Sequence, residues 1–194
     1  MARIPSFSQL KQNFPYAPPE RTPHRSGAIP QAATIAGNKE LVKKIGGNLY
    51  KTLSAIYPKL DEMNTCAIRL SYCLNRSGGR ITPTQGIRTF KGDDGYLYTI
   101  SADEMIAYLR GKYGQPVKIF DGSKRTAKEW LGTVTPPIES IFGYDWQGRI
   151  ELFGASGHVD IGHMPDANVA NIIDIGTGAY FMDGPMKVFF WAAT

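Results

Sequence analysis

The sequence predicts an α+β domain in which helices come first along the chain and an antiparallel sheet comes second. In residues 39–113, apolar side chains recur mainly at helical spacing. Beyond Pro137 the pattern changes to short apolar runs separated by Gly and Pro, which indicates strands. The chain has 194 residues, of which 42% are hydrophobic, and this is enough for one domain with a buried core.

The first part of the chain is rich in proline and has no sustained apolar period. We therefore expect an irregular arm over residues 1–36, followed by one domain over residues 37–194. Residues 39–57 predict two short helices, because Gly46 and Gly47 interrupt their apolar period.

The next helix begins beside a cysteine. Asn64 or Thr65 can cap this helix, which we expect to end at Asn75. Cys66 then lies in its first turn, whereas Cys73 lies two turns further along. At roughly 1.5 Å of rise per residue the two cysteines are about 10 Å apart, which is too far for a disulfide.

One more helix and a run of strands complete the predicted fold. Residues 96–100 predict a short strand. Ser101 and Glu104 resemble a capping box, which predicts a helix over residues 102–113. The later strands are expected at residues 138–142, 149–153, 158–161, 171–175 and 187–191.

Composition excludes several classes of function. The formal net charge of +5 favours polyanionic surroundings, but no recognisable nucleic-acid module accompanies it, so we expect no nucleic-acid partner. No stretch approaches the roughly 20 apolar residues that cross a bilayer, and we expect no membrane insertion. The apolar core of a cleaved secretory signal is missing, so we expect either a cytosolic protein or export that acts on the folded domain. Phosphate-loop, Gly-x-Ser-x-Gly and paired-cysteine zinc motifs are also absent, and we expect no cofactor.

Cys66 is the candidate nucleophile, because a helix N-terminus stabilises the reactive thiolate. Cys73 lies among apolar residues, where a thiol behaves as a small hydrophobe. His158 is the best candidate base, since it opens a strand with its ring on the polar face. A surface histidine without a role is the alternative. His24 lies in the proline-rich arm, and His163 is expected in a loop.

A catalytic histidine needs a third group that orients its ring, and spacing alone does not choose that group. The candidates follow His158 in the sequence: Asp160, Asp166, Asp174 and Asp183. A rival interpretation is a metal site, because His158, Asp160 and His163 form a cluster of a kind that binds zinc in some wall peptidases. It is the weaker one, since no second anchored histidine occurs elsewhere, and we expect no metal.

Residues 65–75, TCAIRLSYCLN, resemble the nucleophile helix of the type VI secretion amidase effectors, fourth family. Other segments resemble the same family in the same order, at residues 45–47, 98–114, 157–160 and 188–191. The likeness covers residues 37–194 and leaves the arm outside it.

This resemblance implies a papain-like, NlpC-type fold, in which a helix-borne cysteine packs on an antiparallel sheet that carries the histidine and a third polar residue. It implies an antibacterial peptidoglycan amidase, a DL-endopeptidase that hydrolyses the bond between D-glutamate and meso-diaminopimelate in stem peptides. It further implies synthesis in the cytoplasm, export by the type VI secretion apparatus, action in the target cell's periplasm, and a cognate immunity protein that blocks the site.

Within this arrangement we assign Cys66 as nucleophile, His158 as base and Asp174 as the orienting carboxylate. Asp174 belongs to the next strand-like run, from which a carboxylate reaches the far ring nitrogen. Asp160 lies about 7 Å along the same strand as His158, beside the ring and not behind it. The sequence departs from the family in two places. The strand of His158 lacks the tryptophan expected near its end and has His163 there instead, and no cysteine pair precedes the orienting carboxylate.

Two other classes of function stay open. One is a housekeeping or phage-type cell-wall hydrolase of the same fold. The other is a non-catalytic wall-binding or immunity-like module, which would tolerate the loss of Cys66.

Overall fold

The computed structural model describes residues 2–13, 15, 31–115, 118–121, 138–145, 157–164 and 187–192. Its helices are α1 (Phe7–Asn13), α2 (Gln31–Ile45), α3 (Gly47–Ile56), α4 (Cys66–Arg76) and α5 (Ala102–Tyr113), with a 3₁₀ turn η2 (Leu60–Glu62). Its strands are β1 (Phe90–Lys91), β2 (Leu97–Tyr98), β3 (Lys118–Asp121), β4 (Ile138–Asp145), β5 (Gly157–Met164) and β6 (Lys187–Ala192).

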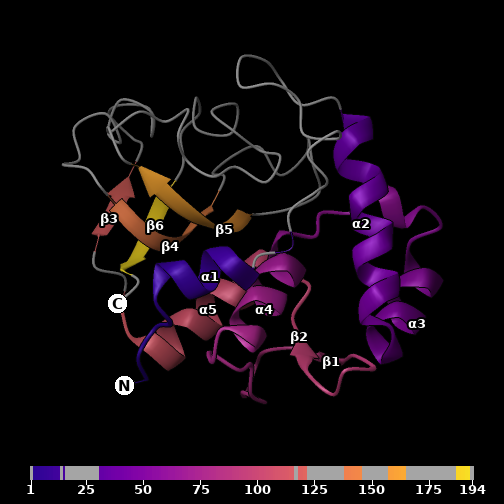
Figure 1. The fold of residues 1–194 in the computed structure, drawn as a ribbon, viewed down its shortest axis with the longest axis horizontal. Coiled ribbons are helices and arrows are strands. Elements are labelled where there is room, and N and C mark those ends of the chain that lie inside the picture. The colour runs from indigo at the N-terminus through magenta and orange to yellow at the C-terminus, as the bar shows by residue number, and fades with distance from the viewer. Residues whose placement is uncertain are drawn as a thin grey trace.

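The strands form two antiparallel sheets. A small hairpin pairs β1 with β2, and the larger sheet has the order β3-β6-β4-β5. In Figure 1 the larger sheet lies over α1, α4 and α5, whereas α2 and α3 stand together on the other side of α4. Strand β5 lies against both α4 and α5. Helices packed on an antiparallel sheet confirm the predicted α+β class.

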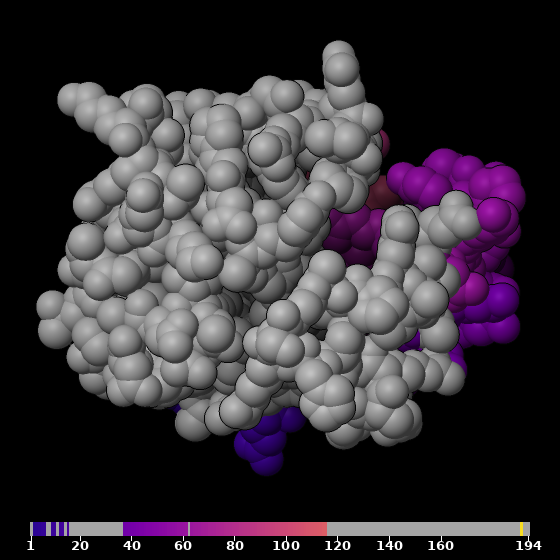
Figure 2. All heavy atoms as spheres, turned by 90° about the horizontal axis from the view of Figure 1, so that it is seen from above, coloured from indigo at the N-terminus to yellow at the C-terminus, as the bar shows by residue number. Residues whose placement is uncertain are grey.

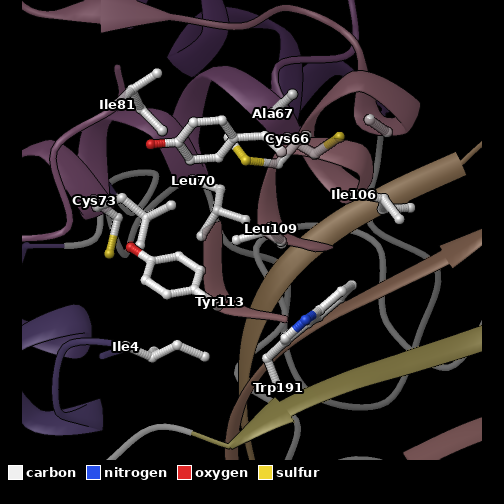
Figure 3. Close-up of a cluster of buried hydrophobic side chains, with 14 of the residues drawn as sticks. Ile4, Cys66, Ala67, Leu70, Cys73, Ile81, Ile106, Leu109, Tyr113 and Trp191 are labelled. Carbon is white, nitrogen blue, oxygen red and sulfur yellow. The ribbon is translucent and has the colours of Figure 1, made fainter. Parts of the chain in front are cut away.

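Helix α4 lies between two hydrophobic clusters. One cluster joins α4 to α1, α5 and the sheet, and it includes Leu70 of α4 and Trp191 of β6, both labelled in Figure 3. The other contains Ile68 of α4 together with buried residues of α2, α3 and β2. Nine of the eleven residues of α4 are buried, so this helix belongs to the core of the domain.

The joint between α2 and α3 requires glycine. Gly46 and Gly47 have φ angles of 65° and 61°. A Cβ on Gly47 would lie 2.6 Å from the carbonyl oxygen of Lys91, and one on Gly46 would overlap the Asp93 side chain. The Asp93 N–H also donates to the Ile45 carbonyl at 2.8 Å. The predicted pair of helices around a glycine joint is confirmed, and the joint also seats the turn of the β1–β2 hairpin.

Helix α5 follows the predicted capping pattern. The Ser101 hydroxyl accepts a hydrogen bond from the Glu104 N–H at 3.4 Å. At the other end Gly114 has a φ of 87° and donates its N–H to the Arg110 carbonyl. The helix therefore spans residues 102–113 as expected.

The N-terminal segment differs from the irregular arm that we expected. Residues 7–13 form α1, and Leu10 on this helix is fully buried. Helix α2 begins at residue 31, before the expected end of the arm at residue 36. The expectation of irregular structure is therefore wrong for these helical residues, whereas a domain beginning at residue 37 stays a prediction. The high proline content had suggested irregular structure. It could not show that Leu10 is buried, because this burial depends on tertiary packing.

Three of the predicted later strands are found, as β4, β5 and β6. The expected strands at residues 149–153 and 171–175 lie outside the described residues. Strand β5 continues to residue 164, so His163 belongs to this strand and not to a following loop. The strand β3 was not predicted, because in four residues the pattern of apolar and polar side chains is too short to distinguish a strand from a turn.

In the part of the chain that the structure describes, every helix is too short or too polar to span a membrane. Helices α2 and α3 form a continuous surface at one side of the molecule, visible in Figure 2.

Replacing Leu10 by Ala should lower the free energy of unfolding by about 2 to 5 kcal/mol, because it leaves a cavity between α1 and α4. Gln12→Ala, at an exposed position on the same helix, is the control and should change it by no more than about 0.5 kcal/mol. Urea denaturation measures both. Equal midpoints for the two variants would mean that α1 is not part of the core.

Candidate active site

The candidate nucleophile Cys66 is the first residue of α4. Thr65 is the residue that precedes the helix, but its side chain makes no capping bond to it. Instead, Asn64 Oδ1 accepts the Cys66 N–H at 3.0 Å. Of the two caps that the sequence allowed, Asn64 is the one that forms. The start of α4 thus has its first donor paired, while Asn64 itself is exposed.

The two cysteines occupy different environments. Both are free thiols, as the sequence predicted. Cys73 is fully buried, and its Sγ donates to the Leu10 carbonyl at 3.1 Å, which ties α4 to α1. Cys66 is 6% exposed and lies at the helix start. Both belong to the cluster drawn in Figure 3. The structural role predicted for Cys73 fits this contact, and the candidate for chemistry stays Cys66.

The candidate base His158 lies at the beginning of β5. Its backbone is opposite Tyr144 of β4. Because β5 packs against α4 and α5, the fold brings the strand of His158 alongside the helix that Cys66 begins. A thiol nucleophile and a histidine base need their side chains within hydrogen-bond reach, and this pairing of Cys66 with His158 stays a prediction.

The carboxylate that would orient His158 is not among the residues described so far. Asp174, our choice, lies outside the described residues, as do the alternatives Asp166 and Asp183. Asp160 lies in β5, where its backbone is opposite Phe142. The assignment of Asp174 stays a prediction.

The metal alternative gains no support from the described residues. Among them no group of three or more His, Cys, Asp or Glu side chains is placed to hold a metal ion. The three members of the suspected cluster, His158, Asp160 and His163, all belong to β5.

The far end of α4 is held by charged and aromatic groups. Arg76 lies 2.7 Å from Asp94, and its guanidinium stands 3.5 Å above the ring centroid of Tyr72. Burial alone would raise the pKa of the Asp94 carboxyl, but hydrogen bonds from Tyr98 and Arg76 outweigh it, so this pKa lies below its ordinary value. Burial raises the pKa of the Tyr98 hydroxyl. Asp94 is therefore a stable anion that pairs the last turn of α4 with the hairpin.

Two polar residues near Cys66 did not emerge from the sequence. Arg69 is one turn after Cys66 and only 5% exposed, and Asn38 on α2 is 3% exposed. Arg69 offered a weak signal, since an arginine inside a helix of otherwise apolar character needs partners. Asn38 offered none, because its partners are distant in sequence.

Comparisons with known proteins identify a matching family. Residues 63–191 match the family model described as Tae4, type VI secretion system amidase effector protein 4. A search of curated proteins finds no match.

Two solved structures illustrate the similarity of the fold. The type VI effector Tae4 from Enterobacter cloacae superimposes with a TM-score of 0.67 at 20% identity, covering 100% of each chain. The effector in the Tae4–Tai4 effector–immunity complex from Salmonella Typhimurium gives 0.66 at 22% identity, covering 98% of this chain and 99% of that one.

Proposed function

We propose, from the premise that this chain belongs to the type VI secretion amidase effector 4 family, that Cys66, His158 and Asp174 carry its amidase reaction. As a member of that family the chain is an antibacterial peptidoglycan amidase, a DL-endopeptidase of the cysteine peptidase type. The matched residues 63–191 include all three proposed catalytic positions.

One observation carries the proposal for the nucleophile. Cys66 begins a buried helix, and that helix lies against the strand that begins with Gly157 and His158. A strand that carries a histidine beside the helix of the nucleophile is what a thiol–histidine pair needs.

The proposed reaction is an acyl transfer in two steps. His158 takes the proton of the Cys66 thiol, and the thiolate attacks the γ-carbonyl carbon of D-glutamate. The C–N bond then breaks, and the diaminopimelate amine leaves with the proton from His158. Water, deprotonated by His158, attacks the thioester, which releases the acid and restores the thiol. Asp174 orients the ring and stabilises its cationic form.

The backbone N–H of Cys66, at the start of α4, is a natural donor for the oxyanion of the reaction. In the resting structure it donates to Asn64 Oδ1. We propose that the substrate oxyanion replaces the Asn64 oxygen as the acceptor. Because Asn64 is exposed, its side chain is able to turn away without disturbing the core.

Family membership also defines the biological setting. The chain is an effector of a type VI secretion system, delivered into target cells. We propose that it acts in the periplasm of those cells, where peptidoglycan stem peptides are exposed. The net charge of +5 would favour contact with an anionic wall. Related Tae4 effectors have been solved in complex with the immunity protein Tai4, and we propose that a cognate immunity protein of this kind binds the present chain.

Digestion of purified sacculi tests the nucleophile. Cys66→Ala should abolish digestion, because no thiolate remains to form the acyl-enzyme, whereas Cys73→Ala should keep most of the activity. Mass analysis of the fragments should show cleavage between D-glutamate and diaminopimelate. Digestion by a folded Cys66→Ala protein, or activity lost in chelator and restored by zinc, would favour the metal alternative.

The third group is tested by Asp174→Asn. It should lower kcat by roughly 10²- to 10⁴-fold with little change in KM, because the imidazolium loses its counter-charge and the ring its anchor. Asp160→Asn and Asp166→Asn are the matched controls and should stay close to the parent. Near-normal turnover of Asp174→Asn, with loss in either control, would reassign the orienting residue.

The site of action is tested by expression with and without a periplasmic targeting signal. Colony counts should fall only for the targeted protein, because its substrate lies outside the cytoplasm, and co-expression of the cognate immunity protein should restore them. Cys66→Ala carried on the same signal controls for the burden of export. Equal killing from the cytoplasm would contradict a periplasmic target.

A further inference from the structure

A buried polar network surrounds the residue that precedes the nucleophile. It consists of the side chains of Asn38, Thr65 and Arg69 with the carbonyls of Met63 and Pro15, and we call it the Asn38 network. The Thr65 hydroxyl donates to Asn38 Oδ1 at 2.6 Å, and the Arg69 guanidinium donates to the same oxygen at 2.9 Å. Arg69 Nε also donates to Thr65 Oγ1 at 3.1 Å.

The network holds the turn before α4 from both sides of Asn64. Asn38 Nδ2 donates to the Met63 carbonyl at 2.9 Å, while Asn38 Oδ1 accepts from Thr65. One side chain of α2 therefore fixes the positions on either side of Asn64. Asn64 is left exposed between them, with its own side chain on the Cys66 N–H.

The same network reaches across the protein. Asn38 comes from α2, Arg69 from α4, and the Arg69 guanidinium also donates to the carbonyl of Pro15 after α1. The side chains of Asn38 and Thr65 are each 3% exposed. Because buried polar groups are costly unless paired, a fully paired set of this kind admits few other arrangements. The start of α4 is therefore fixed relative to two other helices.

Thr65 differs from most threonines that precede a helix. A threonine before a helix usually caps it with its own hydroxyl. Here the Thr65 hydroxyl makes no such bond and instead connects the start of α4 to α2. The N–H of Cys66 is paired by the Asn64 side chain. A cap stabilises a helix locally, whereas the Thr65–Asn38 bond fixes where the helix start lies in the molecule.

We propose that Asn38, Thr65 and Arg69 are positioning residues for Cys66, a role that rests on the thiol chemistry proposed above. They do not touch the substrate. They hold the Cys66 sulfur and its backbone N–H in the geometry that attack and oxyanion binding need. Since small misplacements of a reacting group slow a reaction strongly, loss of the network should appear in kcat more than in KM.

Helix α4 offers a matched control at its other end. The Ser77 hydroxyl follows the last turn and donates to the Gln9 carbonyl at 3.0 Å. Like Thr65, it is a buried hydroxyl that flanks α4 and donates one hydrogen bond to another helix. It lies three turns from Cys66, so its loss should affect stability without affecting the site.

The experiment compares kcat and KM of Thr65→Val, Thr65→Ser and Ser77→Ala on a soluble stem peptide. All proteins are compared at a temperature where circular dichroism shows them folded. Thr65→Val keeps the shape of the side chain and loses the hydroxyl, and it should lower kcat by roughly tenfold to a hundredfold with KM changed by no more than about twofold. Thr65→Ser restores the hydroxyl and should regain most of kcat, while Ser77→Ala should keep the parent value.

A double variant tests the shared hydrogen bond. Because Thr65 and Asn38 share a hydrogen bond and belong to one network, the loss of kcat in Thr65→Val/Asn38→Ala should be clearly smaller than the product of the two single losses. If Thr65→Val does not fold, Asn38→Asp replaces it, since it keeps the Oδ1 acceptor but loses the donor to Met63, and it should also lower kcat.

Three outcomes would each show that the network is only structural. The first is a Thr65→Val or Asn38→Asp protein with the same kcat as Ser77→Ala, and the second is that Thr65→Ser does not restore kcat. The third is a double variant whose loss of kcat equals the product of the two single losses. An inactive parent, or a parent that does not depend on Cys66, would instead refute the proposed function. The two failures are therefore distinguishable.

Discussion

The burial of nine of the eleven residues of α4 is the constraint on which the rest of the structure depends. A helix in this position contributes its apolar side chains to two clusters at once. Its polar side chains are then also inside, and each needs a partner from another segment. Arg69 and the preceding Thr65 find theirs on α2, and Ser71 accepts from the Thr99 N–H. Ser77, which follows the helix, donates to Gln9 of α1. The elements around α4 are thus held by its polar groups as well as its apolar ones.

Parts of the fold with a strong local signal were predictable from the sequence. The capping pair Ser101 and Glu104 gave the start of α5, and the glycine pair at residues 46–47 gave the joint between α2 and α3. Helix α1 was missed, because seven residues have little intrinsic tendency to form a helix and Leu10 gains its stability from α4. The end of β5 at residue 164 was also missed, since strand ends depend on the neighbouring strand.

The choice of candidate residues rested on the same kind of local signal. Cys66 could be chosen from its place at a helix start, and Cys73 set aside from its apolar surroundings, because both arguments use only nearby residues. The strand of His158 was likewise predicted, whereas its alignment with α4 is a property of the fold. Asn38 could not be found, since it lies 31 residues from Arg69 and 27 from Thr65. No periodicity connects positions so far apart.

The contacts of α1 have a further consequence, for the order in which the molecule folds. The bond from Cys73 to Leu10 closes a loop of 63 residues, and the one from Ser77 to Gln9 a loop of 68. Closing such loops costs chain entropy before any contact repays it, so proteins rich in them fold slowly. The helix that carries Cys66 forms from adjacent residues, but its full enclosure requires these distant segments to meet. Enclosure of the nucleophile helix is therefore a late event in folding, and a chain released early from a chaperone would expose a helix that is largely buried in the native fold.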